Sequence, residues 1–127
     1  MKTRMTAVLL VLISGAFFAV AQVPDTLVVA VPFPFYVNGK LLPAGSYKIR
    51  DSVGQAEITV SNENGKDGAL AGVITRLSSS AEDRDSVVFD VTGNDRYLSE
   101  IYIKGEDGFL IKGAPEKHTH TRIQGKS

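Results

Sequence analysis

Hydrophobic and polar residues alternate along most of the chain after residue 22, and the alternation is most pronounced between Val31 and Arg50. In that stretch Phe33, Phe35 and Val37 occupy every second position, which is the period of a β-strand with one buried face. Asn38-Gly39 follows directly, and this dipeptide beside an alternating run predicts a tight hairpin turn. We therefore expect a β-hairpin in which four residues are buried on one side: Phe33, Phe35, Tyr47 and Ile49.

Further runs with strand character lie on both sides of this hairpin, and turn residues such as Asn, Asp and Gly separate them. They cover Asp25 to Val31, Ala56 to Val60, Ala69 to Thr75, Ser86 to Val91, Arg96 to Lys104 and Phe109 to Lys112. No convincing amphipathic helix occurs after residue 22. The pattern predicts an all-β fold, a mostly antiparallel β-sandwich or partly open barrel of about seven or eight strands.

The run from Arg96 to Lys104 does not alternate cleanly. In a regular strand Leu98 and Ile101 would point to opposite faces, although both are large and apolar. A β-bulge near Ser99 or Glu100 would bring them onto the same face. We therefore expect an irregularity in the middle of this strand.

The two ends of the chain differ from this pattern. Residues 1–21 have the layout of a secretory signal peptide, with Lys2 and Arg4, an apolar core and an Ala19-Val20-Ala21 cleavage site. A transmembrane anchor is the rival interpretation, but the apolar run is shorter than the roughly 20 residues that it needs. Residues 22–112 form the predicted β domain. Residues 113–127 are polar without periodicity, so we expect a solvated tail whose removal leaves the fold unchanged.

Composition excludes several classes of function. Loss of Lys2 and Arg4 with the signal peptide leaves 12 basic residues against 14 acidic ones, a net charge of −2, so no basic surface for nucleic acid is indicated. The chain has no cysteine, which excludes disulfides, thiolate metal ligands and a thiol nucleophile. No sequence motif of a nucleotide-binding loop, a serine hydrolase or a zinc protease is present.

The segment from Asp25 to Val31 is apolar on both faces and lies at the expected mature N-terminus. Such a strand can complete its own sheet, or it can add to the exposed edge of a neighbour. The second alternative predicts pairing with another copy of the chain or with another envelope protein.

Few residues offer chemistry. His118 and His120 could bind a divalent metal from one face of a strand, although two histidines in a flexible tail need no such role. Glu100 interrupts an apolar run and, beside Asp90, could serve in acid–base catalysis, or it could simply face solvent. The tyrosines could form a platform for a saccharide: Tyr36, Tyr47, Tyr97 and Tyr102.

One arrangement resembles a known group of proteins. It comprises Val31-Pro32-Phe33-x-Phe35-x-Val37-x-Gly39-x-x-Leu42-Pro43-Ala44-Gly45-x-Tyr47, then Val88-Phe89-Asp90, then Tyr97-Leu98-Ser99-Glu100-Ile101-Tyr102. It is similar to small exported β proteins that are numerous in Acidobacteria-like bacteria and have no established activity or binding residues. The resemblance covers most of the chain after residue 22 and implies export, a single β domain and an environmental bacterial source.

These observations favour a non-enzymatic structural or interaction module of the cell envelope or extracellular matrix, periplasmic or secreted, without a cofactor. The alternative is a small barrel that binds a ligand or saccharide in its interior. A filled core would favour the first function, and a pocket of several hundred Å³ with polar groups would favour the second.

Overall fold

The computed structural model describes residues 26–52, 56–78, 84–105 and 107–126, and this part of the chain contains eleven strands and no helix. The strands are β1 (Thr26–Val31), β2 (Phe35–Val37), β3 (Lys40–Leu42), β4 (Gly45–Asp51), β5 (Glu57–Asn62), β6 (Gly68–Gly72), β7 (Thr75–Leu77), β8 (Ser86–Thr92), β9 (Asp95–Tyr102), β10 (Gly108–Leu110) and β11 (Thr119–Gln124). The all-β prediction is confirmed. The count exceeds the expected one because several strands have only three residues.

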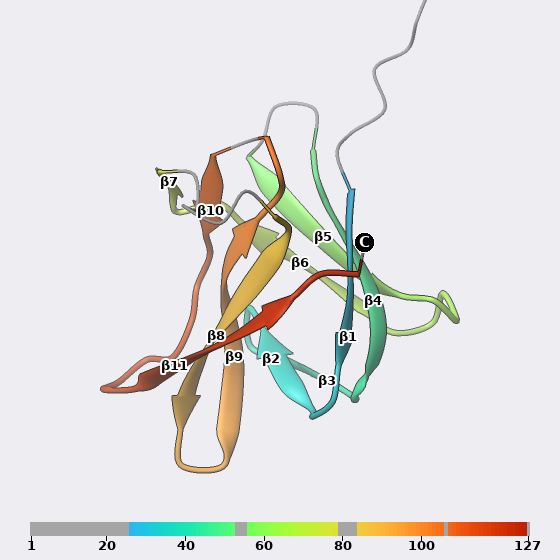
Figure 1. Cartoon of the computed structure of the whole chain (residues 1–127). Coiled ribbons are helices and arrows are strands. Elements are labelled where there is room, and N and C mark those ends of the chain that lie inside the picture. The colour runs from blue at the N-terminus through green and yellow to red at the C-terminus, as the bar shows by residue number, and fades with distance from the viewer. Residues whose placement is uncertain (1–25, 53–55, 79–83, 106, 127) are drawn as a thin grey trace, which may run out of the picture.

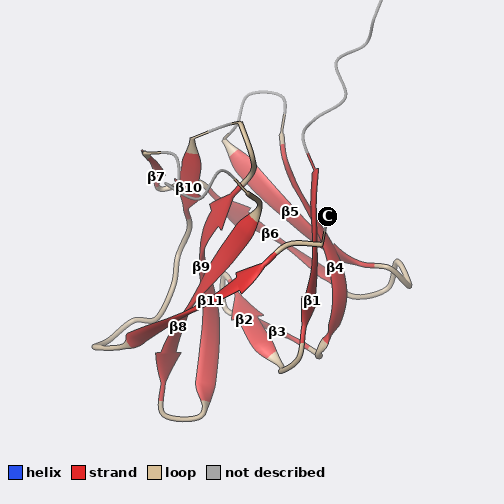
Figure 2. Ribbon diagram, in the orientation of Figure 1, coloured by secondary structure: helices blue, strands red, loops and turns tan. Residues whose placement is uncertain are grey.

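The strands form two sheets that pack face to face as a sandwich (Figures 1 and 2). One sheet has four strands in the order β1-β4-β5-β6. The other has seven, with the path β11-β8-β9-β10-β7, and β2 and β3 extend from β9. Every pairing is antiparallel except that of β2 with β9. The sheets do not close into a barrel.

The predicted turn at Asn38-Gly39 is present and joins β2 to β3. Both residues have positive φ, 49° and 85°, as a two-residue hairpin turn of type I′ requires. The chain then changes sheets after Leu42, because β4 pairs with β1 and β5 and not with β3. The expectation that the buried aromatic residues share one side of a hairpin is therefore wrong. Phe35 and Tyr47 instead meet from opposite sheets, with ring centroids 5.1 Å apart.

The space between the sheets is filled by apolar side chains. Phe35 also packs edge-on against Phe89, with ring centroids 5.4 Å apart. The partly buried Phe33 packs edge-on against Phe89 as well, with ring centroids 5.0 Å apart. Fully buried aliphatic residues surround them: Leu27, Val29, Ile49, Ile58, Val60, Leu98, Ile101 and Ile111. Each such side chain contributes about 1.5–3 kcal/mol through burial, so this layer is the main stabilising element of the fold.

The expected β-bulge is confirmed at Ser99. Phe89 pairs with Leu98 and Val88 pairs with Glu100, so Ser99 is the extra residue on β9. Leu98 and Ile101 are both fully buried as a result. The side chain of Ser99 lies on the outer face of the seven-stranded sheet, where its hydroxyl contacts Asp90.

The C-terminal segment differs from the prediction. Instead of forming a solvated tail, residues 111–118 cross the seven-stranded sheet from β10, and β11 then pairs with β8 over six residues (Figure 1). We call residues 111–118 the crossover segment. All six side chains of β11 are at least partly exposed and only Ile123 packs against the core, so the strand has no apolar alternation that a sequence could display. Its pairing relies on backbone hydrogen bonds, which any residue except proline can make.

The N-terminal strand β1 completes its own sheet. Leu27, Val29 and Val31 point into the core, and the strand pairs along its whole length with β4. On its other side the carbonyl of Val28 accepts a hydrogen bond from the backbone N–H of Lys126 at 2.7 Å. Asp25 and the predicted signal peptide lie outside the described residues.

None of the described residues belongs to a helix that is long and apolar enough to cross a membrane.

Candidate functional site

A row of polar and aromatic residues runs across the outer face of the seven-stranded sheet. His120 on β11 pairs with Asp90 on β8, Asp90 pairs with Tyr97 on β9, and Tyr97 pairs with Tyr36 on β2. Residues directly opposite each other in neighbouring strands point to the same face. The strand register therefore places these four side chains in one line.

Asp90 is the most buried member of this row, with 5% of its surface exposed. Its Oδ1 accepts a hydrogen bond from the Ser99 hydroxyl at 2.9 Å, and its Oδ2 accepts one from the backbone N–H of Ala114 at 3.0 Å. These contacts satisfy a carboxyl group that would otherwise be costly to bury. They also fix the orientation of the carboxylate and fasten the crossover segment to the sheet.

Gly113 allows the crossover segment to approach this closely. A Cβ atom at this position would overlap the carboxylate of Asp90 and press on the Cβ of Ser99. The backbone here does not have positive φ, so glycine is required for space and not for its conformation.

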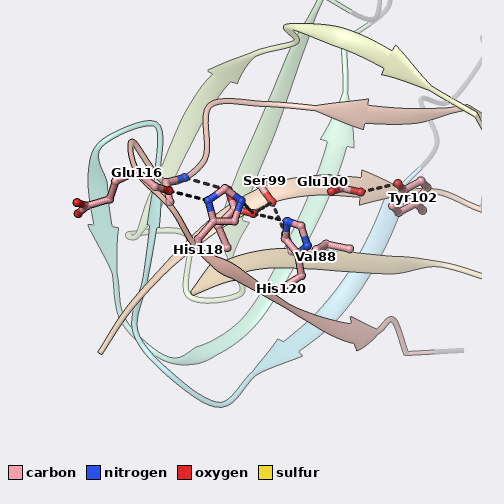
Figure 3. Close-up of polar contacts among 9 residues, drawn as sticks. Val88, Ser99, Glu100, Tyr102, Glu116, His118 and His120 are labelled. Atoms are coloured by element: carbon pink, nitrogen blue, oxygen red, sulfur yellow. Dashed lines mark hydrogen bonds and ion pairs between the residues drawn. The ribbon is translucent and has the colours of Figure 1, made fainter. Parts of the chain in front are cut away.

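Both histidines reach the same carboxylate oxygen. The Nε2 atoms of His118 and His120 each lie 3.3 Å from Oδ1 of Asp90, and the two rings meet with centroids 5.0 Å apart (Figure 3). The Nδ1 of His118 is 2.8 Å from the carbonyl oxygen of Glu116, in the crossover segment. We call Asp90, Ser99, Ala114, His118 and His120 the Asp90 cluster.

The other carboxylate expected near this place does not join the Asp90 cluster. Glu100 is on the same face, but its Oε1 accepts a hydrogen bond from the Tyr102 hydroxyl at 2.5 Å (Figure 3). Burial raises the pKa of Tyr102, and the bond to Glu100 raises it further, while the nearby Arg122 opposes both. Asp90 and Glu100 thus contact different partners, and the acid–base pair that the sequence allowed as one alternative is not formed.

The tyrosines do not form one platform. Tyr47 is fully buried and donates its hydroxyl hydrogen to the carbonyl of Pro43 at 2.6 Å, and burial raises its pKa. Tyr36 and Tyr97 stack on each other with centroids 4.9 Å apart. Tyr102 lies elsewhere on the sheet, under the guanidinium of Arg122. The platform that the sequence allowed is therefore not formed: Tyr47 is in the core, and only Tyr36 and Tyr97 lie together.

The sequence points to both histidines but not to Asp90 as their partner. It suggests a pair of Asp90 with Glu100, because both lie in predicted strands, whereas the histidines lie in a predicted tail. A carboxylate on the outer face of the otherwise apolar run Val87 to Val91 was the available signal. Gly113, at the start of that tail, was a second one, because a glycine can mark close backbone approach.

Asp90, His118 and His120 are a group of potential metal ligands among the described residues, since one atom of each lies within 4.8 Å of the others. A separate hollow of about 370 Å³ lies at the β5–β6 hairpin, lined in part by Lys40, Thr59 and Gly68. It has the size of a small-molecule site, but it is wide open to solvent and so does not resemble the enclosed, mostly apolar sites that hold small molecules.

No family model, curated protein or solved structure matches this chain.

Proposed function

We propose that this chain is a non-enzymatic structural or interaction module, exported to the cell envelope or the extracellular matrix. The observation that carries the proposal is the filled interior of the sandwich. Phe35 contacts Tyr47 and Phe89 across the space where a ligand would have to bind. An interior ligand would have to displace these rings, so the alternative of a ligand-binding barrel has little support.

The polar groups also support this function over catalysis. Asp90, the most buried carboxylate of the outer face, is engaged by Ser99 and by the backbone of Ala114. Its contacts join segments that are distant in sequence, namely β8, β9 and the crossover segment. Their evident effect is to hold the crossover segment in place.

Export rests on the sequence of residues 1–21, with its basic start, apolar core and Ala19-Val20-Ala21 site. A protein exported without cysteine depends on its core for stability. The aromatic and aliphatic layer between the sheets meets that requirement.

A partner, either a second copy or another envelope protein, would pair with the outer edge of β1. The alternative, in which β1 leaves its own sheet to pair with a partner, is costly. It would expose Leu27, Val29 and Val31 to water, and each exposed side chain would cost about 1.5–3 kcal/mol of stability. Displacing Lys126 from the carbonyl of Val28 is far less costly, because it exchanges one backbone hydrogen bond for another. At the opposite edge of this sheet, side chains of Asn38 and Lys40 already bind the carbonyls of Leu70 and Gly68.

The test combines cell fractionation, intact mass and light scattering. We expect to find the protein outside the cytoplasm, with an intact mass that matches a chain beginning at Gln22. Its self-association should increase when residues 125–127 are removed. An unprocessed cytoplasmic chain would contradict export. Saturable binding of a saccharide or apolar ligand by a strictly monomeric protein would favour the alternative function.

A further inference from the structure

The geometry of the Asp90 cluster points to a binding site for a divalent transition metal, zinc in the first instance, held by Asp90, His118 and His120. The metal would sit between the carboxylate and the two imidazoles and fasten the crossover segment and β11 to β8. Such a site would form wherever the protein is located.

Oδ1 of Asp90 faces the Ser99 hydroxyl and both imidazole Nε2 atoms. Its two lone pairs can accept hydrogen bonds from the Ser99 hydroxyl and from one imidazole N–H, which leaves the second Nε2 without a hydrogen bond to this oxygen. One metal ion held by both imidazoles would use one lone pair and leave the other for Ser99.

The distances between these atoms match those between ligands of one metal ion. A charge-assisted hydrogen bond from an imidazolium to a carboxylate is about 2.7–2.9 Å long. Both histidines lie at 3.3 Å from Oδ1, which is longer than such a bond. Ligand atoms at about 2.0–2.1 Å from a tetrahedral zinc ion are about 3.3–3.4 Å apart. The observed separations therefore fit two ligands of one metal better than two direct ion pairs.

The hydrogen bond of His118 to the crossover segment fixes the tautomer of this ring. Nδ1 of His118 lies 2.8 Å from the carbonyl oxygen of Glu116, and a carbonyl can only accept, so Nδ1 carries the hydrogen. In the neutral ring Nε2 then presents a lone pair to Oδ1, which is itself an acceptor. A cation between these two atoms resolves the conflict. Metal-binding histidines commonly donate their other N–H to a backbone carbonyl in this way.

The surroundings suit a metal with nitrogen and oxygen ligands. Imidazole suits zinc, copper and nickel, and the absence of cysteine makes the site independent of redox conditions. Ser99 and Ala114 hold the carboxylate from behind, as hydrogen bonds to a ligating group do in metal sites. His120 has 56% of its side chain exposed, so solvent can reach the site and supply a fourth ligand.

The experiment uses the untagged chain, stripped of metal and titrated with zinc in competition with a chromophoric chelator at pH 8. We expect one zinc ion per chain. His118→Gln and His120→Gln should each weaken zinc binding at least about tenfold, and the double variant should lose saturable binding. Lys117→Gln, an exposed neighbour that is not a ligand, is the matched control and should stay within about twofold.

Nitrogen NMR of the imidazoles gives a second readout, because these are the only two histidines in the chain. Without metal, His118 should carry its hydrogen on Nδ1, and zinc should shift both Nε2 signals. The histidine variants change exposed side chains, so the result does not depend on whether a variant of the buried Asp90 folds. Absence of one-to-one zinc uptake up to about 1 mM, or native affinity in the double variant, would overturn the inference.

Discussion

The first and last strands of this domain are both edge strands, yet they are held by different forces. β1 places Leu27, Val29 and Val31 in the core, and its sequence alternates accordingly. β11 leaves all six of its side chains at least partly exposed and is held mainly by backbone pairing with β8 and by the Asp90 cluster, with Ile123 as its one apolar contact to the core. The difference shows that apolar burial and backbone pairing with polar contacts can support neighbouring strands of one small domain.

The largest expected effect is at β1. Leu27→Ala should lower the free energy of unfolding by about 2–5 kcal/mol, because Leu27 is fully buried between the sheets. Val28→Ala on the same strand is the control and should cost less than about 1 kcal/mol, since Val28 points away from the core. Urea denaturation measures both. Equal losses for the two variants would mean that β1 is not held by its buried face.

A smaller effect is expected when β11 is removed. Deletion of residues 113–127 should lower Tm by about 5–15 °C, equivalent to about 1–3 kcal/mol, because it exposes the edge of β8 and leaves Asp90 without partners from the crossover segment. The core residues stay in place, so the shortened protein should still fold. Calorimetry would show an unchanged Tm if this segment behaved as the solvated tail that the sequence predicts.

Gly113→Ala should lower the free energy of unfolding by a smaller amount still, and it should loosen the crossover segment and β11 but not β1. The added methyl group must push the crossover segment away from Asp90, which should cost about 1 kcal/mol, the low end of the range for an overpacked site, because the pairing of β11 with β8 is kept. Gly72→Ala is the matched control, because nothing lies within 4 Å of the new Cβ and the backbone does not have positive φ. Thermal melts that shift equally for both would show that the segment does not pass close to Asp90.

The same difference explains what could be predicted from the sequence. The alternation of apolar and polar residues predicts the strands that bury one face, and Asn38-Gly39 predicts the turn. Leu98 and Ile101, which a regular strand would point to opposite faces, predict the bulge. The sequence does not predict the change of sheet between β3 and β4. Alternation with a period of two shows which face of a strand is buried, but it does not show which strand pairs with it. β11 was missed because backbone pairing leaves no trace in side-chain pattern.

The Asp90 cluster was only partly predictable for a related reason. His118-x-His120 and Asp90 could each be noted in the sequence, but they are about thirty residues apart. They meet only because the crossover segment passes over β9 and β8, and that path depends on Gly113 and on the register of β11. Neither has a local signature strong enough to predict it.

Native-state hydrogen exchange of the backbone amides tests most directly the claim that the two strands are held differently. Amides of β1 that pair with β4 should exchange only through global unfolding. Amides of β11 should be protected, but by an opening that costs at least about 1 kcal/mol less and leaves β1 intact. Equal protection of β1 and β11, or no protection of β11 at all, would contradict the account.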